Sequence, residues 1–258
     1  MSKPGKSPAA GKTRYGRTVV VSQSMYFPWC GLLDQVRLGD VFVHYDDVQF
    51  ARGFFNRVQV KTEYGIKWLT VPLRAQHRGQ TIDECRIDDA IEWRTRHRDV
   101  LRQAYRKAPF AADMLAVVDA VFAVDHASLG ELGRATIRAL TAAFGLSEPV
   151  FRHSADLGIG GTSSQRLLDI AASCEGTVYL TGHGALNYLD HSIFEARGIE
   201  VRYMDYEIGP WPQDHGEFTP YVTALDALAH LGPAAATALR SKTLHWHEAV
   251  ERRRKTQG

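Results

Sequence analysis

Short runs of β-branched and aromatic residues open the chain, separated by helical or turn-forming segments. Residues 17–23 and 40–47 are predicted as strands, and residues 31–39 between them as a short helix. Residues 56–73 hold two runs of alternating polarity around a Tyr-Gly turn, which is typical of a β-hairpin. A further short strand is predicted at 81–88. The start of the chain therefore predicts a strand, helix, strand unit followed by a hairpin.

Helical spacing replaces this pattern in the middle of the chain. From Asp89 to about Gly145, apolar residues recur every three or four positions and predict three helices, the first with Trp93 and His97 on its apolar face. Strands and helices then alternate again. The later predicted strands are 149–153, 177–182 and 199–207, and the later predicted helices are 162–174, 188–198, 221–232 and 233–255.

Strands that alternate with helices of this length favour a parallel sheet with helical crossovers. We therefore predict an α/β fold with a mostly parallel, Rossmann-like sheet, a β-hairpin and an inserted helical segment. Residues 1–16, rich in Lys, Gly, Pro and Ser, are predicted as a disordered basic tail. Residues 17–258 are predicted as a single α/β domain with the helical insertion at about 89–145.

Composition narrows the class of protein. The 258 residues are 45% hydrophobic and 23% charged, which is ordinary for a soluble globular protein. The chain has 31 basic and 29 acidic residues, so its net charge gives no reason to expect a nucleic-acid partner. The basic N-terminus lacks the apolar segment of a signal peptide, and no apolar stretch of about 18 residues occurs, so we expect neither secretion nor a membrane span.

The cysteines predict a reducing compartment. Cys30, Cys85 and Cys174 are odd in number and far apart, with no C-x-x-C pair and no regular spacing to histidines. We therefore expect a cytoplasmic protein without a metal site of familiar spacing, and the cofactor stays open. Cys30 follows an aromatic turn, where it is either a nucleophile of lowered pKa or, more commonly, a small buried side chain.

Polar residues cluster where the predicted strands end. Ser22 and Gln23 end the first strand, and Asp46, Asp47 and Gln49 end the second. Ligands of open parallel sheets bind at the carboxyl ends of the strands, so these positions predict a site. Neighbouring strand residues face opposite ways, so only one of the two aspartates reaches a ligand, and the polar face favours Asp46. The alternative for the pair is a turn at the strand end.

Two glycine-containing segments add candidates to the same edge. Gly161, Thr162 and Ser163 precede a predicted helix, whose free N–H groups favour phosphate. On the motif alone, an N-cap role for Thr162 or Ser163 is the more common one. His183 lies between two glycines, where the imidazole stands clear of a helix, and it is our preferred catalytic histidine. Its alternative is a loop histidine that caps the next helix. His97 is interpreted as a hydrogen-bonded core residue.

The segment "SQSMYFPWCGLLDQVRLGDVFVHYDDVQFARGFFNRVQVKTEYGIKWLTVP" resembles the opening of the WbqC-like family. Later blocks of that family follow in the same order, so the resemblance covers about Val19 to Gly232. The matching positions are Gln23, Tyr26, Pro28, Trp29, Gly31, Asp46, Asp47, Gln49, Asn56, Arg57, Lys61, Trp68, Gly182, Tyr188, Asp190, Gln213, Gly216 and Asp226. Two positions depart from the family: Ser22 replaces a leading His and Ser24 a Pro, and His44 is a candidate substitute for that His.

The resemblance implies an enzyme of sugar modification, because the family is associated with O-antigen and other sugar-modifying gene sets. Tyr26, Phe27, Trp29 and Phe50 are expected to form the wall of a pocket. The expected catalytic residues are Asp46 and His183. The expected substrate-binding residues are Gln23, Tyr26, Trp29, Asp47, Gln49, Asn56, Arg57, Lys61, Tyr188 and Gln213, and the expected phosphate-binding residues are Gly161, Thr162 and Ser163.

Three functions compete at this point. The favoured one is a transferase that moves an acyl or aminoacyl group onto an amine of a small molecule or sugar nucleotide, with an acyl or peptidyl carrier protein as a possible donor. In it, Asp46 or His183 is the base, Asn56 or a backbone N–H stabilises an oxyanion, and Arg57 and Lys61 bind phosphate or carboxylate. The alternatives are a nucleotide-dependent, nucleotidyltransferase-like enzyme and a non-catalytic binding module for a sugar nucleotide or carrier protein.

Overall fold

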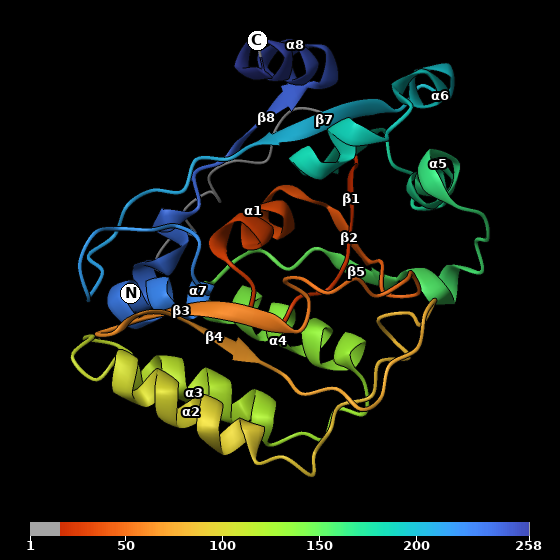
Figure 1. Cartoon of the computed structure of the whole chain (residues 1–258). Helices are drawn as coiled ribbons and strands as arrows, with labels where there is room; N and C mark the ends of the chain where they lie inside the picture. The colour runs from red at the N-terminus through yellow and green to blue at the C-terminus, as the bar shows by residue number, and fades with distance from the viewer. Residues whose placement is uncertain (1–15, 258) are drawn as a thin grey trace, which may run out of the picture.

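A six-stranded sheet forms the centre of the fold in the computed structural model, which describes residues 16–257 (Figure 1). Its strands are β1 (Thr18–Ser22), β2 (Val41–His44), β5 (Val150–His153), β6 (Val178–Thr181), β7 (Glu200–Asp205) and β8 (Lys242–His245). The order is β5-β2-β1-β6-β7-β8, and every neighbouring pair is parallel except β7 with β8. The predicted α/β fold with a mostly parallel sheet is therefore confirmed. Apart from Gly16, the predicted basic tail lies outside the described residues.

The chain leaves the middle of this sheet in two directions. From β1 it crosses through α1 (Cys30–Leu38) to β2, on one side of β1. After β6, which pairs with the other side of β1, it crosses through α6 (His191–Ala196) to β7. Adjacent strands whose connections leave in opposite directions form a topological switch point. The carboxyl ends of β1 and β6 are thus the place where this fold is expected to bind a ligand.

Alternating side chains of β1 enter different cores, as a strand covered on both faces requires. Val19 and Val21 pack in the cluster that includes α5 (Ser163–Ser173) and Phe194 of α6. Val20 faces the opposite way, toward residues of α1 and α4 (Leu129–Ala143). Both faces of the central strands are therefore buried, and only the strand ends and their loops are free to hold polar groups.

A further core joins the hairpin to helices that lie below the sheet in Figure 1. The hairpin is β3 (Arg57–Thr62) with β4 (Gly65–Thr70), as predicted. Helices α2 (Trp93–Ala104), α3 (Ala111–Phe122) and α4 fall inside the predicted helical segment, and α7 (Ala224–Leu231) packs against α3 and α4 from the far end of the chain. The division into one domain with an insertion stays a prediction.

Two predicted elements are wrong. Residues 81–88 make only isolated bridges, because Thr81, Arg86 and Ile87 pair with three different segments and no ladder forms. The predicted helix 233–255 is a 3₁₀ helix η3 (Gly232–Ala238), then β8, then α8 (Trp246–Gln257). The reason is tertiary: β8 adds to the free edge of β7, where its backbone N–H and C=O groups find partners.

No helix within residues 16–257 combines the length and the apolar character that crossing a bilayer requires.

Candidate functional site

A cavity of about 360 Å³ lies at the carboxyl ends of β1 and β6, where the topology predicts a site. We call it the switch-point crevice. It is lined by Val21, Ser22, Gln23, Gln35, Tyr45, Leu167, Tyr179, Thr181, Gly182, Gly184, Ala185 and Tyr188. Two predicted substrate-binding residues, Gln23 and Tyr188, are therefore in it. Most of the others come from β1, β6 and the segment that follows β6. Gln35 of α1, Leu167 of α5 and Tyr45 of the loop after β2 complete the lining, and no local motif marks these three.

The crevice combines hydroxyl, amide and aromatic groups. Tyr45 is half-buried and burial raises its pKa, so its hydroxyl is a neutral donor at physiological pH. The Tyr188 side chain is exposed at the edge of the crevice. Gln35 Nε2 donates to the hydroxyl of Tyr206 at 2.9 Å, which fixes the orientation of the amide. Such a lining suits a polar ring, because it offers ring faces and both donors and acceptors.

His183 does not line the crevice but a neighbouring cavity of about 510 Å³, which residues of α8 also line. It begins the 3₁₀ helix η2 (His183–Asn187), whose Gly184 lines both cavities. Its Nε2 lies 2.6 Å from the carbonyl oxygen of Met204. A carbonyl oxygen only accepts, so Nε2 carries the proton and Nδ1 keeps its lone pair. Gly182 just before it leaves little room for a side chain, because a Cβ there would lie 3.0 Å from the Tyr206 hydroxyl, which would have to move by a few tenths of an ångström. The exposed imidazole is thus held in the tautomer of a base.

Asp47 ties the end of β2 to the helix that covers the crevice. Its carboxylate accepts from Ser154 Oγ at 2.6 Å and from Arg166 Nη2 of α5 at 2.5 Å. Arg166 is buried, and its guanidinium also lies over the ring of Tyr45, 5.0 Å from the centroid. Asp47 therefore positions a wall of the crevice through Arg166. Its predicted contact with substrate stays a prediction.

Asp46 lies in a buried polar network on the other side of the loop. Its carboxylate accepts from Ser24 N at 2.8 Å, from Ser24 Oγ at 2.7 Å and from Arg134 Nη1 at 2.8 Å. Burial raises the pKa of Asp46, while Ser24 and Arg134 oppose that shift. Both aspartates lie beyond the end of β2, and they face different partners. Because Asp46 has no exposed surface, its catalytic role stays a prediction and would have to pass through Ser24.

His44 belongs to the same network. The single hydroxyl proton of Ser24 goes to Asp46, so His44 Nδ1, 2.9 Å from Ser24 Oγ, is the donor in that pair. Burial lowers the pKa of His44 to about 3, and the ring is neutral. It lies beside Ser22 in the sheet, but it is buried against Phe151 and is not among the residues that line the crevice.

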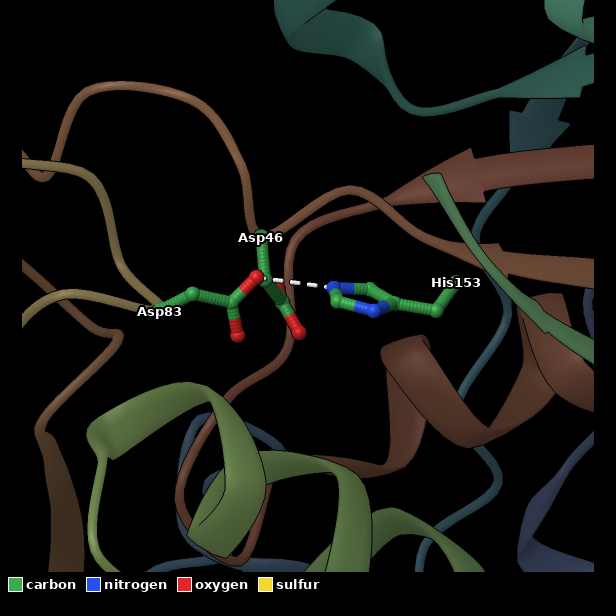
Figure 2. A group of neighbouring side chains, drawn as sticks. All are labelled: Asp46, Asp83 and His153. Carbon is green, nitrogen blue, oxygen red and sulfur yellow. Dashed lines mark hydrogen bonds and ion pairs between the residues drawn. The ribbon is translucent and has the colours of Figure 1, made fainter. Parts of the chain in front are cut away.

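Asp46, Asp83 and His153 form the one cluster of metal-ligand type found in residues 16–257, with ligand atoms within 4.8 Å of one another. Figure 2 shows the three side chains directed at one another. A cation already lies among them: Arg134 Nη1 is 2.8 Å from Asp46, 2.6 Å from Asp83 and 3.3 Å from His153 Nε2. The guanidinium therefore neutralises the carboxylates in the place that a metal would take.

A second cavity, of about 470 Å³, lies between the β1–α1 loop (residues 23–29) and the hairpin. We call it the aromatic cavity. It is lined by Met25, Tyr26, Pro28, Trp29, Phe54, Arg57, Val58, Gln59, Trp68 and Tyr221. Three predicted substrate-binding residues, Tyr26, Trp29 and Arg57, are thus brought together here and not at the crevice. Trp68 and Tyr221 were not predicted as site residues, although Trp68 is one of the positions that match the family. The sequence around Tyr221 does not distinguish it from a core aromatic.

The β1–α1 loop that separates the two cavities is held in a strained shape. Phe27 has φ 37°, in the left-handed region that non-glycine residues avoid. Its N–H donates to Thr136 Oγ1 at 3.1 Å, and its carbonyl accepts from Thr223 Oγ1 at 2.8 Å. Backbone strain of this kind persists only where surrounding contacts fix it. The loop is therefore rigid on both sides, toward each cavity.

The remaining predicted residues lie elsewhere. Lys61 is buried and its Nζ donates to Gln213 Oε1 at 3.0 Å and to the carbonyls of Gly216 and Glu217, so this pair fastens the 213–217 segment. Asn56 Nδ2 donates to the carbonyl of Val71 at 3.0 Å.

Gln49 is exposed in the loop after β2. Gly161, Thr162 and Ser163 are exposed at the start of α5, and none of the three lines the crevice. Cys30 is fully buried and burial raises its pKa, which fits the small buried side chain and not the nucleophile. His97 is buried with Nδ1 3.0 Å from the Tyr26 hydroxyl, and its pKa is lowered to about 4 by burial, as a core histidine requires.

Comparisons with known proteins identify relatives. A model of the WbqC-like protein family matches residues 23–238. Uncharacterized protein Rv1507c of Mycobacterium tuberculosis (strain ATCC 25618 / H37Rv) is 31% identical over 228 residues, which cover 87% of this chain and 98% of that protein. No solved structure matches significantly.

Proposed function

Because the chain belongs to the WbqC-like protein family, we propose that it is a transferase of amino-sugar, O-antigen or specialised-metabolite biosynthesis. It moves an acyl or aminoacyl group to an amine of a small molecule or sugar nucleotide. The observation that carries the proposal is the junction of a polar, ring-sized crevice with an exposed histidine whose Nδ1 keeps its lone pair.

The acceptor binds in the switch-point crevice. Its volume of about 360 Å³ falls in the range of about 300–1,000 Å³ that is usual for small-molecule sites. Tyr45 and Tyr188 supply ring faces and hydroxyls, and Gln23 supplies an amide that both donates and accepts, as sugar hydroxyls require.

A phosphate of the acceptor binds at the start of α5. Support for this comes from Ser164 Oγ in the first turn, which donates to the carbonyl of Tyr188, a residue that lines the crevice. This bond joins the start of α5 to the crevice, although Gly161, Thr162 and Ser163 do not line it. The positive end of the helix dipole favours the same negative charge.

His183 is the base. An amine is protonated at neutral pH and has no lone pair for attack until it loses a proton. Nδ1 of His183 accepts this proton, the amine nitrogen attacks the carbonyl carbon of the donor, and a tetrahedral intermediate forms. The first proton passes from His183 to solvent. His183 then takes the second proton from the nitrogen of the intermediate and delivers it to the departing thiolate or phosphate of the donor, so that a neutral amide remains.

The donor is an activated acyl or aminoacyl compound, free or bound to an acyl or peptidyl carrier protein. The reaction is proposed for the cytoplasm. The free, buried state of Cys30, Cys85 and Cys174 fits a reducing compartment.

A second candidate is a nucleotide-dependent, nucleotidyltransferase-like enzyme. The strand order places a crevice at a switch point, where doubly wound sheets commonly bind nucleotides. The two candidates differ in what the crevice holds, a nucleoside triphosphate that reacts or an amine-bearing acceptor.

The test begins with thermal stabilisation by nucleoside triphosphates, amino-sugar nucleotides such as UDP-glucosamine, and acyl thioesters. A ligand at 100 times its Kd adds about 2.7 kcal/mol, which raises Tm by roughly 5–10 °C for a chain of this size. Stabilised pairs are then incubated and analysed by mass spectrometry for an N-acylated product.

Tyr188→Ala is expected to abolish the thermal stabilisation by the acceptor. His183→Gln is expected to keep that stabilisation and to abolish formation of the product. Tyr64→Ala is the matched control, because this tyrosine is 89% exposed on the hairpin turn. Stabilisation by triphosphates alone, with pyrophosphate release, would replace the first candidate with the second. Binding without any product would leave a binding module.

A further inference from the structure

The aromatic cavity lies across the β1–α1 loop from the crevice, and the proposed reaction so far gives it no role. We propose that it binds an apolar acyl or aryl group that carries an anionic substituent, and that Arg57 binds this anion. The proposal rests on the proposed function in one respect, namely that this group belongs to the donor.

The lining of the cavity is unusually aromatic for a surface that faces solvent. Trp29 and Trp68 are half-buried, while Phe54 is 62% exposed and Tyr221 68% exposed at the rim. Each aromatic side chain removes about 150–250 Å² from water when fully buried, so a ligand seated here gains substantial apolar contact. The volume of about 470 Å³ accommodates a ring or a short chain.

Arg57 is prepared to bind an anion at this cavity. Its guanidinium lies over the Trp68 ring, 4.4 Å from the centroid, and its Nε donates to the carbonyl of Gly53 at 3.1 Å. These contacts fix the plane of the group. Among residues 16–257, neither Nη1 nor Nη2 of Arg57 has a hydrogen-bond or carboxylate partner. A planar fork with two free donors suits a carboxylate or a phosphate.

The side chains that lie between the two cavities support the assignment of an acyl donor to the aromatic cavity. Trp29 lines the aromatic cavity, and its ring lies 5.1 Å from that of Tyr206. Tyr206 in turn accepts a hydrogen bond from Gln35 of the crevice and lies 5.3 Å from the imidazole of His183. One layer of side chains therefore separates the two cavities, and the proposed base stands at that layer. A donor in the aromatic cavity has its reactive end beside the acceptor.

The anion and the apolar group are recognised by different residues, so they are tested separately. Isothermal titration calorimetry with 3-phenylpropionate measures both, and the neutral 3-phenylpropan-1-ol measures the apolar part alone. We expect both to bind the full chain with a negative heat-capacity change, the carboxylate at least tenfold more tightly. Arg57→Gln is expected to remove this difference and leave the affinity for the alcohol unchanged.

Arg57→Lys keeps the charge but loses the fork, and it is expected to retain only part of the difference. Tyr221→Ala is expected to weaken both probes, and because that ring is exposed the variant should fold normally. Arg78→Gln and Tyr64→Ala are the matched controls, since both side chains are exposed and neither lines the cavity. Both controls should bind the probes as the wild type does.

Absence of binding by either probe up to about 10 mM, or equal affinities of the acid and the alcohol, would overturn the inference. Unchanged binding in both Arg57→Gln and Tyr221→Ala would overturn it as well. The proposed function can fail separately. If the probes bind as expected but no donor and acceptor give an N-acylated product, the transferase function is refuted and the proposal for the aromatic cavity stands. If Arg57→Gln and Tyr221→Ala both transfer the acyl group fully, with unchanged KM for the donor, the aromatic cavity does not bind the donor. The proposed transferase function would then stand without it.

Discussion

Replacing Arg134 by Met removes the cation from the buried network and tests what holds the carboxyl ends of β2 and β5 together. In the variant the Asp46 carboxylate, which has no exposed surface, keeps Ser24 as its donor but loses its counter-ion. Asp83 loses its 2.6 Å ion pair at the same time.

The expected loss follows from burial. Removing one partner of a buried ion pair costs about 3–5 kcal/mol. Arg134 and Asp83 keep 20% and 22% of their side-chain surface exposed, so the lower end, about 3 kcal/mol, applies. This lowers Tm by roughly 6–12 °C for a chain of this size. Arg102→Met is the control, because its pair with Asp99 is 64% and 55% exposed and should contribute less than about 1 kcal/mol.

The loss depends on pH with a definite sign. Burial raises the pKa of Asp46 in the folded state, so the charged form destabilises the fold above the unfolded pKa. This cost disappears as the pH falls through the folded pKa. Arg134 opposes the shift in the wild type, so its removal makes the cost larger. Urea denaturation should therefore show a larger difference between variant and wild type at pH 8 than at pH 5.

The Arg134→Met variant is also expected to bind a metal ion at this cluster. Without Arg134, a histidine and two carboxylates face one another within 4.8 Å, a donor set that suits Mn²⁺ or Zn²⁺. We expect MnCl₂, compared with EDTA, to raise the Tm of the variant and not that of the wild type. Equal stabilisation of both proteins, or a variant within 1 kcal/mol of the wild type at pH 8, would refute this account of Arg134.

Three further outcomes follow from the buried side chains. Cys30→Ala should fold and keep activity within tenfold, and native protein treated with iodoacetamide should show no adduct on Cys30 by intact mass; a stable acyl adduct there would instead indicate thioester chemistry. His97→Ala leaves the Tyr26 hydroxyl without its partner, so urea denaturation should show a loss of about 1–3 kcal/mol with unchanged turnover, whereas unchanged stability with lost turnover would make His97 catalytic. Lys61→Met removes three hydrogen bonds to the 213–217 segment, so limited proteolysis should cut there first, and an unchanged cleavage pattern would argue against the fastening role.

The fold was largely predictable because its strands are short, apolar and separated by helices with clear periodicity. The local sequence pattern fails to predict a strand where tertiary contacts decide which segments pair. Residues 242–245 form β8 because the edge of β7 is available for pairing. In the sequence, helical patterns lie on both sides of these residues, so the whole segment was predicted as one helix. Residues 81–88 have the composition of a strand, but no single segment lies beside them for a ladder.

The site was predictable where topology places residues and obscure where distant segments meet. The strand-end rule led to Gln23 and to the two aspartates, and it could not show that Arg134, 88 positions from Asp46, neutralises one of them. One missed partner did carry a signal. Arg57 pairs with Thr70 in the hairpin, so Trp68, two residues along on the same face, is its diagonal neighbour.

The central claim is that the switch-point crevice binds the acceptor beside His183. Hydrogen exchange, followed by mass spectrometry with and without the amino-sugar nucleotide that stabilises the protein most, tests it directly. We expect slowed exchange in residues 181–189, which carry η2 and Tyr188, and in residues 22–24 at the end of β1. Slowed exchange confined to β3 and β4 or to α8, with residues 181–189 unchanged, would contradict it.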